Sequence, residues 1–138
     1  MLQKLTNFSI AVNSIDEAAE LYGKMFGLEL MRPAGPASAY GFKAAWLGNG
    51  TDEFIELLEP TDDNLGVARF LKSRGEGVYL VAFDVEDLSE SVRQVRANGG
   101  RVAGVPEGED PGPDTNVVWV HPTTTKGVFI QLQRPGAH

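Results

Sequence analysis

The sequence predicts an α+β fold of two βαβββ modules, whose curved, mostly antiparallel sheets surround a cup and carry helices on their outer faces. The main observation is an internal repeat, because the segment that starts at Asn7 aligns without gaps with the segment that starts at Leu80. Each copy shows an alternating strand, then a capped helix, then short strands separated by glycine- and proline-rich turns. The length of 138 residues, with 42% hydrophobic and 22% charged residues, fits one domain over residues 1–138.

Module one is expected over about residues 4–60, from the periodicity of its apolar residues. Its first strand is marked by the alternating apolar residues Phe8, Ile10 and Val12. Ser14 and Glu17 have the spacing of a capping box, so a helix is predicted to begin there and to end at Gly27. The apolar stripe of this helix, expected to be buried, consists of Ile15, Ala18, Ala19, Tyr22 and Phe26. The later strands are expected at about 28–32, 39–47 and 53–59.

Module two, expected over about residues 77–135, repeats this pattern after a linker of about 61–76. The linker is predicted to contain a helix near 64–73, from its apolar spacing. Asp87 and Glu90 form a relaxed capping box at the start of the helix of module two. The later strands of this module are expected at about 101–104, 115–121 and 127–133.

Three further positions have a predicted local role. Tyr79 alternates away from Leu80 and is therefore expected to pack in the core. The acidic loop Pro106–Asp114 is rich in glycine and proline, and its two interpretations are a lid over a site or a simple connection. His121 precedes a proline, which favours a role in capping a turn over a catalytic one.

Composition and charge exclude several classes of protein. Twelve Lys and Arg against nineteen Asp and Glu give a net charge of −7 and a pI near 4.7, without the basic stripe of a nucleic-acid-binding protein. The absence of cysteine excludes disulfides and cysteine-based catalytic or zinc sites. Neither a signal peptide nor an apolar run of about 20 residues is visible. We therefore expect a cytoplasmic protein whose partner is a small molecule, with no nucleic acid and no membrane.

The ordered set of motifs resembles the vicinal oxygen chelate superfamily, which includes glyoxalase I, extradiol dioxygenases and bleomycin-resistance proteins. The segments that carry this resemblance are FIELLEP, RFLKSRGEGVYLVAFDVED, ANGGRV and VVWVHPTTTKGVFIQL, which follow the methylmalonyl-CoA epimerase branch almost element by element. The resemblance covers about residues 4–133. It implies a glyoxalase-like fold with a divalent metal at the bottom of the cup, and a homodimer.

The metal-ligand positions that the resemblance implies fall on Asn7, Glu56, Leu80 and Gln131. The family has histidine at the first and third of these positions, and both histidines are absent here. Leu80 has no donor atom, and the amides of Asn7 and Gln131 are weak neutral donors, so only Glu56 brings charge. A catalytic divalent site needs about three good ligands. We therefore expect no bound transition metal and no cofactor.

Glu56 has two interpretations. In apolar surroundings that include Phe54, its carboxylate is a candidate general base with a raised pKa. Alternatively, it forms hydrogen bonds with Asn7 and Gln131 and only fills the former metal position. The two amides are in turn candidates for binding a substrate carbonyl or enolate oxygen, or for a purely structural polar network.

Strand alternation places further residues beside these candidates. Ser9 shares the parity of Asn7, and Asp84 shares that of Leu80, so both are expected to line the cup. An aromatic wall for a flat ligand is the alternative to core packing for several aromatic residues expected on strands. The candidates for this wall are Trp46, Trp119, Tyr40, Phe42 and Phe129, and Phe54 beside Glu56 is a further candidate for substrate binding.

Three functions are compatible with these residues. The first is a metal-independent enzyme of the isomerase, epimerase or lyase type, in which Glu56 moves a proton next to a carbonyl and Asn7 and Gln131 bind the oxyanion. The second is a non-catalytic small-molecule-binding or resistance protein of the bleomycin-resistance type. The third is a metal-dependent enzyme of the methylmalonyl-CoA epimerase kind with atypical ligands.

Overall fold

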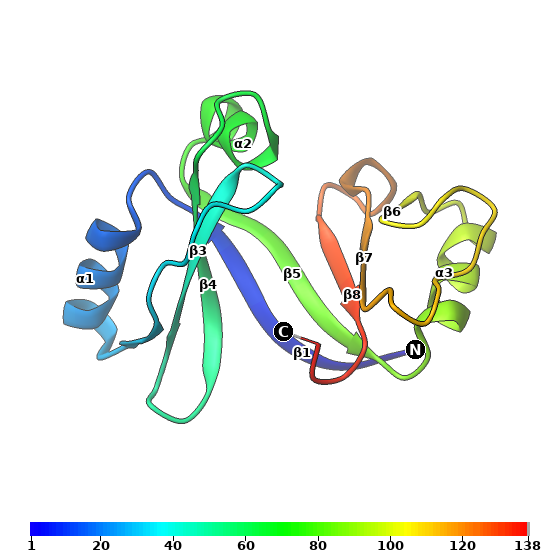
Figure 1. Ribbon diagram of the computed structural model, residues 1–138, viewed down its shortest axis with the longest axis horizontal. Coiled ribbons are helices and arrows are strands. Elements are labelled where there is room, and N and C mark those ends of the chain that lie inside the picture. Colours follow the sequence, from blue (N-terminus) through cyan, green and yellow to red (C-terminus); the bar gives the residue numbers. More distant parts are fainter. Residues whose placement is uncertain (138) are drawn as a thin grey trace. The chain divides into compact units, whose positions relative to one another are not determined.

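The structure, a computed structural model, describes residues 1–137, with three α-helices and eight β-strands in two copies of a βαβββ order (Figure 1). The first copy consists of β1 (Leu2–Ala11), α1 (Ile15–Phe26), β2 (Glu29–Arg32), β3 (Phe42–Gly48) and β4 (Glu53–Pro60). After α2 (Gly66–Arg74), the second copy consists of β5 (Gly77–Val85), α3 (Leu88–Ala97), β6 (Val102–Ala103), β7 (Val117–Val120) and β8 (Ile130–Gln133). The predicted α+β class with duplicated βαβββ order is confirmed.

The strands follow the hydrogen-bonded order β2-β3-β4-β1-β5-β8-β7-β6. β1 pairs with β4, and β5 with β8, in parallel, whereas the β2–β3, β3–β4, β6–β7 and β7–β8 pairs are antiparallel. The chain divides into two compact units, which we call the first-repeat unit (Asn7–Tyr79) and the second-repeat unit (Met1–Thr6 with the chain from Leu80 onward). The first six residues thus belong with the second repeat, and the Thr6 hydroxyl donates to the carbonyl of Ala82 at 3.1 Å.

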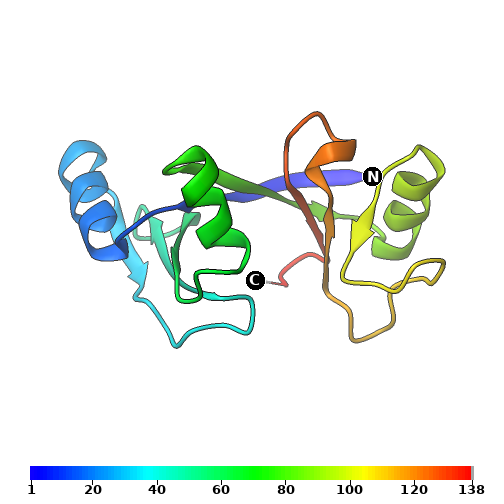
Figure 2. The same ribbon diagram turned by 90° about the horizontal axis from the view of Figure 1, so that it is seen from above.

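In the first-repeat unit, α1 and α2 cover opposite faces of the strands (Figure 2). The predicted cap is present, since the Ser14 side chain accepts from the backbone N–H of Glu17 at 3.2 Å, and Gly27 ends α1 in the left-handed region. Residues under α1 form the larger apolar cluster: Ile10, Val12, Ile15, Ala45, Leu47, Ile55 and Leu57. Those under α2 are Ala11, Leu58 and Val67, with Phe70 and Tyr79 packed against them.

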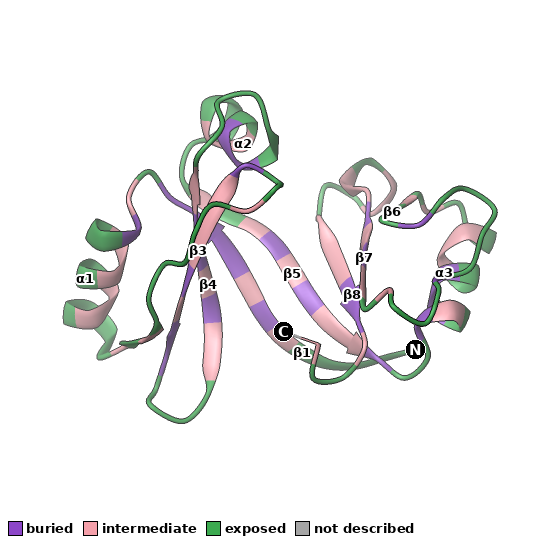
Figure 3. Cartoon of the chain, viewed as in Figure 1, coloured by how far each residue is buried: buried purple, intermediate pink, exposed green. Residues whose placement is uncertain are grey.

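The second-repeat unit has one helix, α3, on one face of its strands. Asp87 accepts from the backbone N–H of Glu90 at 3.0 Å, so the relaxed capping box is also present. The cluster beneath α3 consists of Val85, Leu88, Val92, Val105, Val118, Val120 and Leu132. Buried and half-buried residues alternate along β7 and over residues 79–83 of β5, as expected when successive side chains point to opposite faces (Figure 3).

Two of the predicted strands begin later than expected, because a turn precedes the first residue that pairs with the neighbouring strand. The strand expected at 39–47 begins only at Phe42, because Gly41 has φ 83° and closes a turn with its N–H donating to the carbonyl of Ser38. Tyr40, expected on a strand, therefore lies in this turn and is 62% exposed. The strand expected at 115–121 is limited to the four residues of β7.

The same cause shortens two further strands of the second repeat. The strand expected at 127–133 begins at Ile130, since Gly127 has φ 90° and continues the turn that follows the 3₁₀ helix Pro122–Thr124. Phe129, expected on this strand, thus precedes it. The strand expected at 101–104 covers only β6, because Gly104 has φ 96°. The other later strands and the linker helix agree with the prediction within two residues.

Two core predictions have different outcomes. Tyr79 packs edge-to-face on Phe70 of α2, with ring centroids 5.3 Å apart, so its predicted core role is confirmed. Phe26, in contrast, is 68% exposed, because it is the last residue of α1, where its ring packs edge-to-face on that of Tyr22 with centroids 5.9 Å apart. None of the helices in residues 1–137 is long and apolar enough to cross a membrane.

Candidate functional site

Four strands of the first-repeat unit bring polar side chains onto the sheet face that α1 leaves uncovered. Ser9 on β1 lies opposite Glu56 on β4, and Glu56 lies opposite Trp46 on β3. Trp46 in turn lies opposite Arg32 on β2. Register partners point to the same face of a sheet, so these side chains form one row across it. Asn7 is two residues before Ser9 and shares its face.

Glu56 is bonded to a buried hydroxyl. The Ser9 Oγ donates to Glu56 Oε1 at 2.6 Å, a length typical of a hydrogen bond to an ionised carboxylate. Ser9 is fully buried and Asn7 is only 4% exposed, whereas Glu56 is half-buried. The carboxylate is therefore held in one orientation by a shielded donor and keeps part of its surface accessible. Sequence reasoning placed Ser9 near Glu56 but did not identify it as the donor.

Arg32 extends the row with a positive charge. Its guanidinium carbon lies 4.6 Å from the centroid of the Trp46 ring, and its Nη2 is 2.6 Å from Oε2 of Glu53. Stacking on an indole leaves the edge of a guanidinium available for hydrogen bonds. Sequence alternation could not place Arg32 on this face, because the β2–β3 register shifts between Leu30 and Arg32.

In the second-repeat unit, the equivalent face carries a chain of hydrogen bonds. Ala82 on β5, Gln131 on β8 and Trp119 on β7 are register partners, and so are Asp84 and Gln133. The indole Nε1 of Trp119 donates to Gln131 Oε1 at 2.9 Å, and Gln131 Nε2 donates to Gln133 Oε1 at 2.8 Å. Gln133 Nε2 donates to Asp84 Oδ1 at 3.2 Å. Gln133 is fully buried.

The residues predicted for the site thus fall into two groups. One group, in the first-repeat unit, consists of Asn7, Ser9, Trp46 and Glu56. The other, in the second-repeat unit, consists of Leu80, Asp84 and Gln131.

The predicted aromatic residues outside these groups have other surroundings. Phe54 packs against the cluster under α1, and the exposed Tyr40 lies in a turn. Phe129 is half-buried, and its carbonyl accepts from the backbone N–H of Val81 at 3.0 Å. Sequence reasoning did not identify Gln133. It lies two residues after Gln131 on the same strand, so alternation could have placed both side chains on one face.

The residues at the implied metal positions do not fit a divalent metal. Leu80 is buried and has no donor atom, and the side-chain oxygen of Gln131 accepts from the indole of Trp119. Over residues 1–137, no three His, Cys, Asp or Glu side chains are grouped closely enough to hold a metal ion. A transition-metal site needs about three strong donors.

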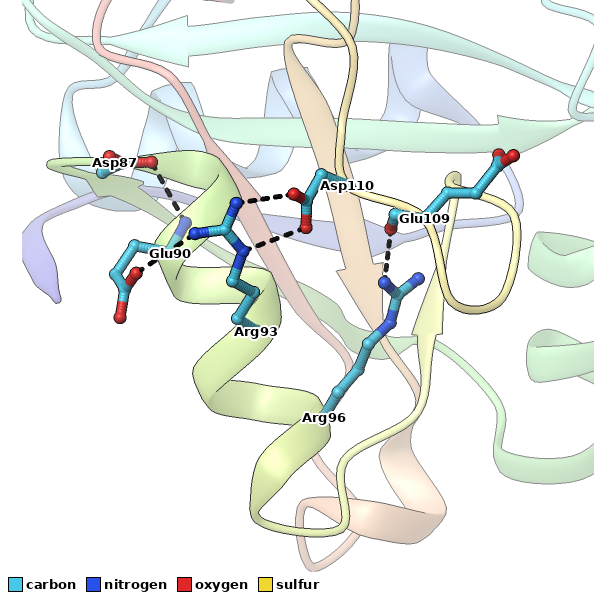
Figure 4. A network of polar contacts seen from close by, with 6 residues as sticks. All are labelled: Asp87, Glu90, Arg93, Arg96, Glu109 and Asp110. Carbon is cyan, nitrogen blue, oxygen red and sulfur yellow. Dashed lines mark hydrogen bonds and ion pairs between the residues drawn. The ribbon is translucent and has the colours of Figure 1, made fainter.

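The acidic loop after β6, residues 104–116, is bonded to α3 (Figure 4). Arg93 donates to both carboxylate oxygens of Asp110, at 3.1 and 2.6 Å, and Arg96 donates to the carbonyls of Glu109 and Pro106. The hydrogen bond with Arg93 lowers the pKa of Asp110, and the same contact raises the pKa of Arg93. The loop is thus more than a simple connection, since α3 positions it through side-chain bonds.

Comparison with known proteins adds a family and a set of relatives. The sequence profile of the glyoxalase/bleomycin resistance protein/dioxygenase superfamily matches residues 7–118. The mitochondrial methylmalonyl-CoA epimerase of Dictyostelium discoideum is 27% identical over 136 residues, which cover 94% of this chain and 77% of that protein.

Two solved structures have the same fold over nearly the whole chain. Methylmalonyl-CoA epimerase from Mycobacterium tuberculosis superposes with a TM-score of 0.79 at 30% identity, and the match covers 98% of this chain and 89% of that one. A variant of the Streptomyces coelicolor methylmalonyl-CoA epimerase, in complex with 2-nitronate-propionyl-CoA, has a TM-score of 0.79 at 25% identity. This match covers 99% of the present chain and 100% of the other.

Proposed function

This chain belongs to the glyoxalase/bleomycin resistance protein/dioxygenase superfamily, and we propose that it is a metal-independent enzyme that moves a proton next to the carbonyl of a small molecule. Its reaction is of the isomerase, epimerase or lyase type. The observation that carries the proposal is the 2.6 Å hydrogen bond from the buried Ser9 hydroxyl to the half-buried carboxylate of Glu56. A carboxylate that is oriented by a shielded donor and still accessible has the properties of a general base.

In the proposed reaction, Glu56 removes a proton from the carbon next to the carbonyl. The C–H electron pair forms a C=C bond, and the carbonyl π electrons move to oxygen, which gives an enolate. Protonated Glu56 then returns a proton to the same face of the carbon, which gives exchange with solvent, or to the neighbouring carbon in an isomerisation. An epimerisation additionally needs an acid on the opposite face of the enolate. In a lyase, the enolate instead expels a leaving group from the adjacent carbon. Asn7, buried on the same face as Ser9, is the proposed donor to the carbonyl oxygen.

Thioesters of coenzyme A are the first substrates to test. The epimerases that resemble this chain are named for methylmalonyl-CoA, and one of the similar structures contains 2-nitronate-propionyl-CoA. The proposal also includes a homodimer in the cytoplasm, and light scattering at micromolar concentration checks the dimer.

Proton exchange measures the proposed step directly. The purified protein is incubated in D₂O with EDTA and with a panel of CoA thioesters and small 2-oxo and 2-hydroxy compounds, and ¹H NMR follows the loss of the α-proton. We expect exchange that the Glu56→Gln variant loses by about 10²–10⁴-fold. Glu20→Gln, which removes an exposed carboxylate that pairs with Lys24 on α1, is the matched control and should keep full exchange. Exchange that survives in Glu56→Gln contradicts the role of Glu56.

The metal-independent part of the proposal has its own measurement. Elemental analysis of protein purified without a chelator or a histidine tag is expected to give far less than one divalent ion per chain. A value near one, together with exchange that EDTA abolishes, would instead support the metal-dependent alternative.

A second candidate function, ligand binding without chemistry, is favoured by the stacked pair of Arg32 and Trp46. An indole face beside a guanidinium suits a flat, negatively charged ligand. Under this alternative, a compound that quenches tryptophan fluorescence with saturation is recovered unchanged and without deuterium. Trp46→Leu should weaken this binding, whereas Glu56→Gln should not.

A further inference from the structure

We propose that the second-repeat unit has a small-molecule site of its own, in a pocket under α3 that takes a neutral, mostly apolar molecule with one hydroxyl group, such as an alkylphenol. The pocket lies on the face of the strands that points away from Gln131, so the inference goes beyond the proposed function and does not depend on it. Two observations carry it. One is an uncharged pocket of about 380 Å³, and the other is Ser91, a lining residue whose buried hydroxyl has no hydrogen-bond partner.

The pocket lies between α3 and the strands that this helix covers. Its floor consists of Val120 on β7 and of Ile130 and Leu132 on β8, which belong to the apolar cluster beneath α3 or pack against it. Val120 lies opposite Ile130, and Leu132 follows two residues later on the same strand. All three side chains therefore share the face that α3 covers.

One side of α3 forms the wall of the pocket. Ser91, Gln94, Val95 and Asn98 are spaced by three and four residues, which brings their side chains to the same side of a helix. Among residues 1–137, none of those that line the pocket has a charged side chain, although 22% of the chain is charged. A charged ligand would lose hydration here without gaining an opposite charge, so the pocket favours neutral molecules.

The hydroxyl of Ser91 is a polar group that the protein buries and leaves unbonded. Ser91 is 6% exposed, and over residues 1–137 its Oγ is the only buried side-chain nitrogen or oxygen without a hydrogen bond. The hydroxyls of Thr124 and Thr125, which also line the pocket, donate instead to the carbonyls of His121 and Val128. A buried hydroxyl without a partner is unfavourable, so a ligand that supplies one gains affinity. A ligand hydroxyl suits serine, because each can donate and accept.

The first repeat shows that the fold does not require a hydroxyl at this place. The alignment that pairs Asn7 with Leu80 also pairs Ala18 of α1 with Ser91 of α3. Ala18 packs against the apolar cluster beneath α1. A methyl group is therefore sufficient for a helix to cover the strands, and alanine is also the better helix former. The hydroxyl of Ser91 is thus an addition that helix packing does not explain.

A second difference between the repeats concerns the space beside the helix. The same alignment pairs Tyr22 of α1 with the smaller Val95 of α3. The hollow that Tyr22 lines has a volume of about 250 Å³ and is also lined by the carboxylates Glu17 and Glu76. The hollow that Val95 lines is larger, and its lining side chains are uncharged. The second repeat therefore has both the room and the polarity that a neutral ligand needs.

The volume of the pocket sets the size of the ligand. Since a cavity of about 150 Å³ binds benzene, one of about 380 Å³ holds roughly 10–15 non-hydrogen atoms. The probe p-propylphenol has this size and one hydroxyl group. Propylbenzene is the matched probe without the hydroxyl, and p-propylbenzoate is the matched probe with a negative charge.

The first experiment measures binding by ¹H–¹³C NMR of methyl groups. Titration with p-propylphenol is expected to shift the signals of Val95, Val120 and Ile130 with saturation, and to leave the signals of Leu47, under α1, unchanged. The affinity for p-propylbenzoate should be lower by at least about 10-fold. Equal affinities would overturn the proposal. So would the absence of shifts with p-propylphenol, whether α3 or a second copy of the chain closes the pocket.

The second experiment tests the hydroxyl of Ser91. Ser91→Ala should lower the affinity for p-propylphenol by about 5–10-fold and leave that for propylbenzene unchanged, because only the phenol can form the hydrogen bond. Ser89→Ala is the matched control, since Ser89 is a half-buried serine of the same helix that does not line the pocket. This variant should bind both probes like the wild type. A loss for both probes, or for neither, in Ser91→Ala contradicts the role of the hydroxyl.

The third experiment tests the location of the site. Val95→Tyr copies the residue of the first repeat and fills part of the pocket, so it should lower the affinity for both probes by more than about 10-fold. Circular dichroism checks that this variant is folded. Wild-type affinities in a folded Val95→Tyr variant would show that the probes bind elsewhere and would overturn the proposal.

The fourth experiment tests the unbonded hydroxyl without any ligand. Ser91→Ala should raise Tm by about 2–4 °C more than Ser89→Ala does, because it removes a buried polar group that lacks a partner. The Ser89→Ala variant accounts for the higher helix propensity of alanine. A lower Tm in Ser91→Ala than in Ser89→Ala would show that the hydroxyl already has a partner in the free protein, such as a helix carbonyl or a bound water. That result would overturn the inference.

Discussion

The two repeats place different chemistry on the same register. In the first-repeat unit, Glu56 lies between Ser9 and Trp46, and in the second-repeat unit Gln131 lies between Ala82 and Trp119. The backbone pairing is thus retained, while a carboxylate in one copy corresponds to a neutral amide in the other. A duplicated sheet can therefore change its chemistry through side chains alone, because register depends on the alternating apolar residues of the opposite face.

The two side chains are also oriented by different means. Glu56 accepts directly from the hydroxyl of its β1 neighbour, Ser9, at 2.6 Å. Ala82, the equivalent β5 neighbour of Gln131, has no hydrogen-bond donor in its side chain. Instead, hydrogen bonds from Gln131 to Gln133 and from Gln133 to Asp84 orient the amide. The first-repeat unit therefore orients a carboxylate by one direct hydrogen bond, and the second-repeat unit orients an amide by a chain of hydrogen bonds.

The largest expected effect comes from exchanging the two central side chains. The double variant Glu56→Gln/Gln131→Glu keeps the composition but should lose at least about 10³-fold of proton exchange, because the new carboxylate faces an indole and lacks the Ser9 donor. Initial rates of α-proton loss in D₂O measure this. Recovery of wild-type rates would show that the two positions are interchangeable, and would contradict the conclusion that the two repeats orient these side chains differently.

A matched pair of core substitutions tests whether the two units contribute equally to stability. Leu57 and Leu132 occupy equivalent positions in the two repeats and are 0% and 3% exposed. Leu57 lies under α1, and Leu132 lies under α3. Changing either to Ala should lower the free energy of unfolding by about 2–5 kcal/mol. Urea unfolding followed by circular dichroism gives both values. A loss below about 1 kcal/mol in only one variant would show that the two cores are not equivalent.

Reciprocal changes beside the two central residues should have a smaller effect. Ser9→Ala removes the donor to Glu56 and should reduce exchange by about 10-fold, with a stability loss of about 1 kcal/mol. Ala82→Ser adds a hydroxyl in the other copy, where the relay already orients Gln131, and should leave the rate within about twofold. Steady-state kinetics and urea unfolding of both variants check this, and equal rates in Ser9→Ala and wild type would contradict it.

The smallest effect concerns the ion pair between Arg93 and Asp110, which the first repeat lacks. The contact lowers the pKa of Asp110, so its contribution to stability is present above the unfolded carboxyl pKa, about 4, and disappears as pH falls through the lower folded value. Because the pair is exposed, Asp110→Asn should lower Tm only slightly at pH 7. Thermal unfolding of both proteins from pH 7 to pH 2 measures the difference, which should vanish at the acidic end. A difference that grows with acid would have the wrong sign.

Particular residues show how far the sequence predicts the fold. The capping pairs Ser14–Glu17 and Asp87–Glu90 were predictable, because a cap requires only a local spacing. Tyr40 and Phe129 were placed on strands wrongly, because the strand starts depend on left-handed backbone at Gly41 and Gly127. Glycine permits that conformation but does not reveal where the chain adopts it.

Within the candidate site, composition and alternation predicted which residues lie on a face, but not which atoms meet. Asn7, Ser9 and Glu56 share a face because side chains alternate along a strand. The pairing of Ser9 with Glu56, the stacking of Arg32 past a register shift and the direction of the Gln131 amide depend on neighbours from other strands.

The sequence by itself therefore determined the duplicated βαβββ order and the helix caps. These properties are local, so they require no knowledge of strand register. Only the tertiary structure decided that the carboxylate of Glu56 accepts a hydrogen bond from a buried hydroxyl and that the side chain of Gln131 bonds to Trp119 and Gln133. The physical reason is that hydrogen-bond direction belongs to a network, and the register of β4 and β8 assembles each network from distant parts of the chain.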